Sequence, residues 1–330
     1  MKVLYHCYGG SHSSVTAAAI HLGLLPRDRV PKEEELKRVP FFDRTGRKSE
    51  GEIRLMGEDG HGNQVYVLGR KDLGPVAIRC LMGVARIFGI DTSNLFLVDT
   101  LPVVNLKMRV GGFTSRVLRL VSPGRAWVSR GTQQAYYHLV RLVEEVERKT
   151  KIRAEDENTA PTIPPGAREK KVVFYHCFGS AHSSVVSAAL HLGLLPRDRV
   201  PRAGEICRLP YYDRVDNDEI GTPFPFGTDE KGYEVYIIGT GEGKKLIPKL
   251  IAEFLSLYGI PASNLYFVDA LRNANWQVRV GGFLSRRVGL VVPGRYLTVV
   301  GIRRNYPAFV EAVEGVKDRL PGRAPVVDPP

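Results

Sequence analysis

Histidine, cysteine and serine side chains gather in a short loop near the start of the chain, between a strand-like run and a helix-like run. The stretch is VLYHCYGGSHSSVTAAAIHLGLLPRDRVP over residues 3–31, and it returns as VFYHCFGSAHSSVVSAALHLGLLPRDRVP over residues 173–201. A β-branched run, a glycine loop and an alanine-rich helix in this order predict an anion site, because loop N–H groups and the positive end of the helix dipole converge there. The pattern indicates a binding site without naming a reaction.

The loop therefore supplies the candidate ligand-binding residues. Gly9 frees the backbone to turn and to approach a ligand, and a serine at the start of the helix can cap an orphan N–H group. His12 and its counterpart His182 stand where a side chain could lean over a bound anion. The candidates are Gly9, Gly10, Ser11, His12, Ser13 and Ser14 in the first copy, and Gly179, Ser180, His182, Ser183 and Ser184 in the second.

Aspartates follow two apolar strands, at the strand ends where ligands of α/β proteins gather. Asp99 and Asp269 could hold Mg²⁺ through water, accept a hydrogen bond from a ligand hydroxyl, or cap the helix that begins nearby. Asp43 and Asp213, each followed by an arginine, are further supporting polar residues. We expect a small phosphorylated ligand, with Mg²⁺ beside it if the ligand is a nucleotide, and the cofactor is otherwise unknown.

Arginines near repeated glycines are the candidate anion clamps. The double glycine at 111–112 returns at 281–282, inside a helical pattern. Such glycines cost helix stability, so they indicate a close backbone approach or a break. The arginines that could neutralise a phosphate are Arg116 and Arg286, with Arg125 and Arg295 as weaker candidates.

The loop could also carry out chemistry, with His12, Cys7, His182 and Cys177 as the candidate catalytic residues. A helix N-terminus lowers the pKa of a thiol and can make it a nucleophile, and histidine can act as acid or base in phosphoryl transfer or hydrolysis. The loop lacks the lysine and the spacing of GxxxxGK[ST], which argues against P-loop ATP hydrolysis. The sixth residue after Cys7 is Ser13, where cysteine phosphatases have arginine, so we favour Cys7 as a small buried residue.

Three other interpretations of the loop stay open. It could be a tight turn whose histidines bond to the backbone, or the duplicated domain could be a non-catalytic interaction module with a basic surface. His6, Cys7, His12 and His21 are of types that bind zinc. Neighbours on a strand point to opposite faces, however, so we assign no metal site.

The composition is that of a globular protein with a basic excess. The net charge of +12 is spread along 330 residues without a block of five basic residues, which favours a phosphorylated ligand over nucleic acid. No apolar run reaches membrane-spanning length, and the N-terminus turns polar too early for a signal peptide. The four cysteines form no disulfide framework. We therefore expect a cytoplasmic protein with no membrane segment.

An internal duplication sets the domain organisation. Adding 170 to a residue number in the first half gives its counterpart in the second, so that His6 matches His176 and Asp99 matches Asp269. The plain interpretation is two copies of one domain, over residues 1–150 and 171–320. Residues 151–170 are Pro-rich and charged and predict a linker, and residues 321–330 predict a flexible tail.

Each copy alternates strands and helices. The expected strands of the first copy are residues 3–7, 65–68, 95–98 and 126–129, the last matching 296–300, and the expected helices are 13–24, 75–88, about 103–118 and 134–147. The polar, turn-rich stretch 27–63 is expected to be loop. Continuous apolar strands that alternate with helices predict right-handed crossovers and a parallel sheet. We predict two tandem three-layer α/β domains, each with a mostly parallel sheet of about four strands flanked by helices. The strand order is not readable from the sequence.

The motif YHCxGxxHSS, followed by HLGxLP and a later strand that ends in glycine, resembles a family of bacterial domains of unknown function from Gram-positive (Firmicute), largely spore-forming anaerobes. His, Cys, Gly, His, Ser and Ser hold their positions in both copies, and the resemblance covers essentially the whole chain outside the linker and tail. Its members are mostly single-copy, so the tandem form is a departure. The resemblance implies a tandem architecture and a cytoplasmic bacterial protein, and it implies no activity, substrate or site residue.

Overall fold

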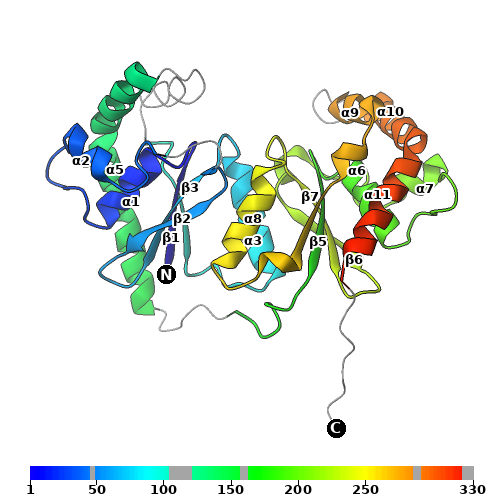
Figure 1. The fold of residues 1–330 in the computed structure, drawn as a ribbon, viewed down its shortest axis with the longest axis horizontal. Helices are drawn as coiled ribbons and strands as arrows, with labels where there is room; N and C mark the ends of the chain where they lie inside the picture. Colours follow the sequence, from blue (N-terminus) through cyan, green and yellow to red (C-terminus); the bar gives the residue numbers. More distant parts are fainter. Residues whose placement is uncertain (45–48, 104–120, 157–162, 285–290, 322–330) are drawn as a thin grey trace, which may run out of the picture. The chain divides into compact units, whose positions relative to one another are not determined.

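The computed structural model describes residues 1–44, 49–103, 121–156, 163–284 and 291–321, with the backbone alone at 121–130 and 291–292. The chain divides into two compact units, residues 1–74 with 89–163 and residues 75–88 with 164–330. Each unit carries one four-stranded, mostly parallel sheet flanked by helices (Figure 1). The predicted pair of tandem α/β domains is confirmed.

The two sheets have the same topology. The strands are β1 (Lys2–Cys7), β2 (Ile53–Glu58), β3 (Gln64–Gly69) and β4 (Leu95–Asp99) in the first, and β5 (Val172–Cys177), β6 (Pro223–Thr228), β7 (Glu234–Gly239) and β8 (Leu265–Asp269) in the second. Their orders are β2-β3-β1-β4 and β6-β7-β5-β8, with only β2 and β6 antiparallel. In the register of the first sheet, Cys7 pairs with Gly69 and His6 with Asp99. The loop after β1 therefore begins beside the ends of β3 and β4.

Helices cover the sheets. They are α1 (Ser13–His21), α2 (Glu33–Arg38), α3 (Gly74–Ile87) and α5 (Val121–Asp156), then α6 (Ser183–His191), α7 (Ala203–Cys207), α8 (Leu246–Ser256), α9 (Trp276–Phe283), α10 (Val291–Arg304) and α11 (Tyr306–Arg319). Short 3₁₀ turns add η2 (Asn217–Glu219), η3 (Ala262–Asn264) and η4 (Ala270–Asn273). In the second unit α6 and α11 lie on one side of the sheet and α8 on the other (Figure 1). Helix α3 groups with the second unit, where Nε of Arg79 donates to the carbonyl of Ile220 at 2.8 Å.

The first helix of each repeat is enclosed. Every residue of α1 and of α6 is buried. Alternate strand residues such as Val3 and Tyr5 pack against alanines of α1 in one continuous apolar cluster. Small side chains bring the helix close to the sheet, and the burial holds its N-terminus at the strand ends. The fold thus fixes the loop that carries the candidate residues.

The predicted fourth strand is wrong. Residues 126–129 lie within α5, and residues 296–300 lie within α10. Their aromatic and β-branched composition favours a strand, but tertiary packing overrides propensity. In α10 the buried residues Thr298, Val299 and Ile302 follow helical spacing, which places them against the core.

The remaining strand comes from the stretch expected to be loop. β2 and β6 are edge strands that pair antiparallel with β3 and β7 and contain a bulge. β6 was not predicted because it contains Pro223 and Pro225. Proline argues against a central strand and is tolerated only in an edge strand. The predicted last helix is longer in the first repeat, where α5 continues to Asp156. In the second repeat the counterpart of α5 is divided into α10 and α11, and α11, which corresponds to the predicted helix, begins with Pro307 in its first turn.

Gly281 confirms the close backbone approach that the double glycine indicates. A Cβ on Gly281 would lie 2.7 Å from the carbonyl oxygen of Gly294 and 2.8 Å from the amide nitrogen of Thr298. On Gly282 it would contact the ring of His182, at 3.5 Å from Nδ1 and 3.8 Å from Cε1. Glycine at position 281 lets α9 contact the backbone of α10.

We predict opposite effects of alanine at these neighbouring glycines. Gly281→Ala should lower the free energy of unfolding by about 1 to 3 kcal/mol through overpacking. Gly282→Ala should leave it unchanged or raise it by up to about 1 kcal/mol, as alanine favours helix. Urea unfolding of both variants measures this, and equal effects at the two positions would contradict the packing described.

Candidate functional site

In both repeats an aspartate holds the loop histidine. Nε2 of His12 lies 3.1 Å from Oδ1 of Asp43, and Nε2 of His182 lies 3.2 Å from Oδ1 of Asp213. Both histidines are more than nine-tenths buried. A buried ring that donates to a carboxylate has a fixed orientation and tautomer, so this histidine is positioned before any ligand arrives.

An unusual backbone presents that aspartate. Asp43 and Asp213 have φ angles of 52° and 55°, and Phe41 and Tyr211, two residues earlier, have 65° and 63°. Non-glycine residues rarely adopt this left-handed conformation, and bulky ones do so only where the surroundings enforce it. The amide of each aspartate also donates to a carbonyl of the loop, at 3.1 Å and 3.0 Å. Main chain and side chain together fasten the aspartate to the loop.

The loop cysteine is buried and hydrogen-bonded. Sγ of Cys7 accepts from the amide of Gly10 at 3.0 Å and lies 3.1 Å from Oγ of Ser14. Burial raises the pKa of the Cys7 thiol, but hydrogen bonds from Ser14, Ser13 and Gly10 outweigh it, so the pKa lies below its usual value. The expected burial of Cys7 is confirmed, together with a donor set that stabilises a thiolate. Cys177 has the same neighbour, Oγ of Ser184, at 3.1 Å.

The predicted serine caps are wrong. The N-cap residues of α1 and α6 are His12 and His182, and neither makes a side-chain cap hydrogen bond. Oγ of Ser13 instead accepts from Thr100 at 2.8 Å. Oγ of Ser14 contacts the thiol of Cys7. The two serines that begin α1 therefore hold neighbouring side chains in place and do not cap the helix.

The predicted loop glycine is displaced by one residue. The left-handed conformation lies at Gly10, with φ of 63°, and at Ser180, with φ of 59°. A Cβ on Gly10 would lie 2.5 Å from the amide of Gly69, so glycine there lets the loop contact the end of β3. At Gly179 a Cβ would meet nothing within 4 Å, which leaves the backbone open on that side.

In the first repeat an arginine links the strand ends. Nε of Arg70 donates to Nδ1 of His6 at 3.0 Å, and Nη2 pairs with Oδ2 of Asp99 at 2.8 Å. Arg70 is only 5% exposed. Burial lowers the pKa of His6 to about 4. The charge of Asp99 opposes this shift, and the charge of Arg70 adds to it. His6 is therefore neutral at physiological pH and accepts from the arginine.

The second repeat has no such link. Thr240 occupies the position of Arg70, and its hydroxyl donates a hydrogen bond to the carbonyl oxygen of Cys177 at 3.2 Å. Nδ1 of buried His176 has no hydrogen-bond partner among the described residues. Asp269 accepts from the amide of Leu271 as the N-cap of η4, and Nζ of Lys244 lies 3.8 Å from it. Capping is one of the three roles that the sequence left open for this aspartate, and it is the role seen in the structure.

A cavity of about 430 Å³ opens beside the second loop. It brings together four predicted residues, Cys177, Gly179, His182 and Ser183, with Phe178 and Ala181. Helix α9 and the turn before it supply Leu271, Val278, Arg279, Gly282 and Phe283, and the loop after β7 supplies Glu242. Asp269 does not line this cavity. Arg279 and Glu242 were missed from the sequence, although Arg279 and its counterpart Arg109 both stand two residues before the repeated double glycine, a signal that could have found the arginine.

Several predicted residues lie elsewhere. Arg116, Arg286 and the glycines at 111–112 fall outside the described residues, as do the helix expected at 103–118, except its first residue, and the tail from residue 322. Of Arg125 only the backbone is described. Nε of Arg295 donates to Oδ2 of Asp213 at 2.7 Å, so this arginine supports the histidine–aspartate pair.

His21 lies far from the loop, in a buried series of hydrogen-bonded side chains. The Tyr5 hydroxyl is 2.9 Å from Nδ1 of His21, and Nε2 is 3.0 Å from Asp59. Tyr175, His191 and Asp229 repeat this arrangement. Across the described ranges, three or more metal-ligating side chains nowhere gather as a metal site. None of the helices in those ranges is both long and apolar enough to cross a membrane.

Comparison with known proteins gives one match. The model of a family described as "Protein of unknown function (DUF3189)" matches residues 2–148 and again residues 172–318. No curated protein and no solved structure matches the chain. The two matches coincide with the two repeats of the sequence.

We predict a pH dependence of stability from His6. Its pKa of about 4 in the folded chain lies below the ordinary 6.5, so between these values the unfolded chain binds the extra proton. Stability is therefore full above pH 6.5 and falls as the pH is lowered, by about 2 kcal/mol between pH 7 and pH 5. The lowered pKa values of His176 and His191 act with the same sign.

Urea unfolding of the wild type and of His6→Gln at both pH values measures the His6 share. Glutamine can still accept from Arg70 but does not titrate, so the variant should lose less stability than the wild type. His61→Gln, at an exposed histidine, is the matched control. An unchanged pH dependence in His6→Gln would show that His6 is not the group responsible.

Proposed function

We propose a ligand-binding function for this chain, which belongs to the DUF3189 family: the second repeat binds a small phosphorylated molecule in the cavity beside its first loop. The observation that carries the proposal is the position of the cavity, which is lined by the start of α6, by His182 and by Arg279. A cavity of about 430 Å³ is of the size that holds small molecules and cofactors.

The polar groups of the cavity suit an anion. Amides at the start of α6 and the positive end of its dipole favour a phosphate near Ser183. The exposed Arg279 is bound to the carbonyls of Ala274 and Leu271 at 3.3 Å each, long contacts that a phosphate could replace. His182 lines the cavity with an orientation fixed by Asp213.

The other lining residues limit the rest of the ligand. Leu271, Val278 and Phe283 form an apolar wall, which suits a sugar ring or a base. Glu242 places a carboxylate at the same cavity, which favours hydrogen-bond donors such as hydroxyls on the part of the ligand away from the phosphate. We therefore propose a sugar phosphate or nucleotide rather than inorganic phosphate alone.

A thiol-dependent reaction is the second candidate function, because Cys177 lines the same cavity as His182. In that case Sγ of Cys177 attacks the phosphoryl group, the P–O bond to the rest of the ligand breaks, and His182 gives the leaving oxygen its proton; water then hydrolyses the thiophosphate and regenerates the thiol. Cys177→Ser would then abolish turnover and keep binding. If binding occurs without turnover of any phosphorylated compound, the simple binding function stands.

Thermal shifts and calorimetric titration with phosphate, sulfate and a nucleotide panel, with and without Mg²⁺ at fixed ionic strength, test the binding. A ligand at 100 times its Kd should add about 2.7 kcal/mol to the stability of the unit that binds it. Arg279→Ala should weaken binding by about tenfold or more, since a hydrogen bond to a charged group contributes about 1.5 to 3 kcal/mol. His182→Ala should abolish it without unfolding the chain.

Arg304→Ala is the matched control, because Arg304 is exposed and lies outside the cavity lining. Binding that responds equally to Arg279→Ala and Arg304→Ala would reflect the general basic charge of the chain. Unchanged affinity in both Arg279→Ala and His182→Ala would exclude this cavity as the site.

A further inference from the structure

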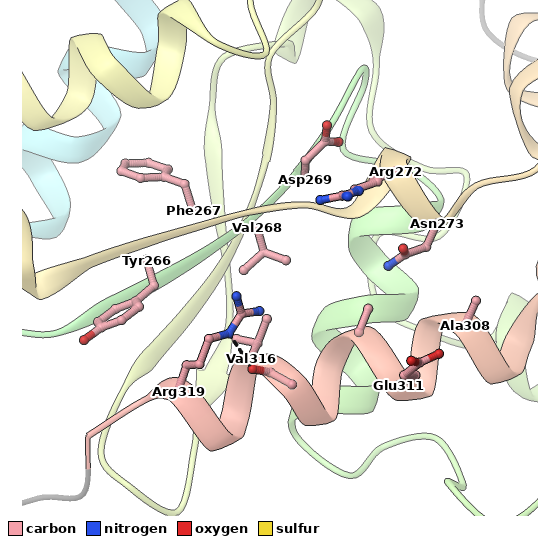
Figure 2. Close-up of a pocket in the computed structure, with 12 residues that line it drawn as sticks. Tyr266, Phe267, Val268, Asp269, Arg272, Asn273, Ala308, Glu311, Val316 and Arg319 are labelled. Atoms are coloured by element: carbon pink, nitrogen blue, oxygen red, sulfur yellow. Dashed lines mark hydrogen bonds between the residues drawn. The ribbon is translucent and has the colours of Figure 1, made fainter.

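A second groove of the second unit lies apart from the candidate site, between strand β8 and helix α11 (Figure 2). Its volume is about 730 Å³. Tyr266, Phe267 and Val268 of the strand line one side, and Ala308, Ala312, Gly315 and Val316 of the helix line the other. The groove therefore runs along the outer edge of the sheet, with an apolar middle.

Small side chains on α11 open this groove. Ala308, Ala312 and Gly315 face it at helical spacing, where the first repeat has His138, Leu142 and Glu145. A Cβ on Gly315 would meet nothing within 4 Å. A stripe of small residues at this spacing allows a second helix to approach the backbone of α11 closely, and the first repeat lacks this stripe.

The main chain of β8 is available on the same side. β8 is the last strand in the order β6-β7-β5-β8, and within the described part of the chain no strand pairs with its outer edge. Its sequence, LYFVD, has neither the lysine nor the proline with which proteins protect such edges. The opposite edge strand, β6, carries Pro223 and Pro225. The sheet is thus closed to pairing at one edge and open at the other.

The charges at the two ends of the groove are opposite, so the groove of one copy is complementary to the groove of a second copy turned end to end. Arg319 lies at one end beside Tyr266, and Asp269, Arg272 and Glu311 lie at the other (Figure 2). Arg319 is a positive charge at the first end and Glu311 a negative charge at the second, where Nζ of Lys244 lies 3.8 Å from Asp269. A two-fold axis through the middle of the groove would exchange the ends, and would place Arg319 of each copy beside Glu311 of the other.

We propose that this groove is the interface of a symmetric homodimer. β8 pairs antiparallel with β8 of a second copy, and the two α11 helices pack antiparallel along their small residues. A self-complementary patch is what a two-fold interface requires, and pairing of edge strands supplies main-chain hydrogen bonds. This surface is separate from the phosphate-binding cavity, so the proposal does not depend on the proposed function.

Sedimentation velocity and light scattering of the full chain over a wide concentration range test the dimer. The expected mass is twice the 36.7 kDa of one chain. Arg319→Glu and Glu311→Arg should each weaken dimerisation by about tenfold or more, because each places like charges together twice. The double variant exchanges the charges and should restore dimerisation to within about threefold, a result expected only if these residues meet across a two-fold axis.

Gly315→Leu tests the groove without threatening the fold, because the open space at Gly315 accepts a side chain and leucine favours helix over glycine. This variant should be monomeric, and it should melt no lower than the wild type at concentrations where both are monomers. Glu314→Arg, an exposed charge change on the same helix outside the lining, should leave the dimer intact. A chain that stays monomeric at all concentrations would overturn the proposal. The open edge of β8 would then be a candidate binding site for a strand of a different protein. A dimer that is insensitive to Gly315→Leu and to the charge exchange would also overturn it.

Discussion

The hydrogen bond between the loop histidine and its aspartate is the contact around which each repeat is arranged. It joins the start of α1 or α6 to a distant segment just before β2 or β6, and a main-chain bond reinforces it. The aspartate reaches this position only through a left-handed backbone that costs about 1 kcal/mol or more. Since both repeats accept that cost at matching positions, the geometry of His12 and His182 is a shared constraint of the fold.

Much of this architecture could be predicted from the sequence. Three strands per repeat, the first helix, the loop and the duplication follow from apolar runs and from the repeated motif. The fourth strand could not be predicted, for two reasons. Tyr296 to Val300 favour a strand by composition but fold as helix through packing. Pro223 and Pro225 lower the strand propensity of a segment that does form an edge strand. Of the site, the loop was predictable and its partners were not. Asp213 pairs with both His182 and Arg295. These contacts join segments that are far apart in the chain, so the sequence does not reveal them.

The two repeats also differ at the strand ends next to that shared loop. Arg70 lies across His6 and Asp99 next to Gly74, where a Cβ would lie 2.6 Å from the guanidinium carbon and would force the arginine to shift. In the second repeat both positions have changed together, to Thr240 and Lys244. The positive charge has thereby moved from a buried position to one whose side chain is 60% exposed. The duplication has kept the histidine–aspartate pair and has changed the electrostatics beside it.

The prolines of β6 have a consequence for assembly. A sheet with two open edges can add neighbours without limit and grow into a filament, whereas a sheet with one usable edge can join only one other sheet. With Pro223 and Pro225 at the far side, any pairing through β8 ends at eight strands. Two residues that weaken local strand propensity thus limit the sheet of the second unit to a single strand-pairing neighbour.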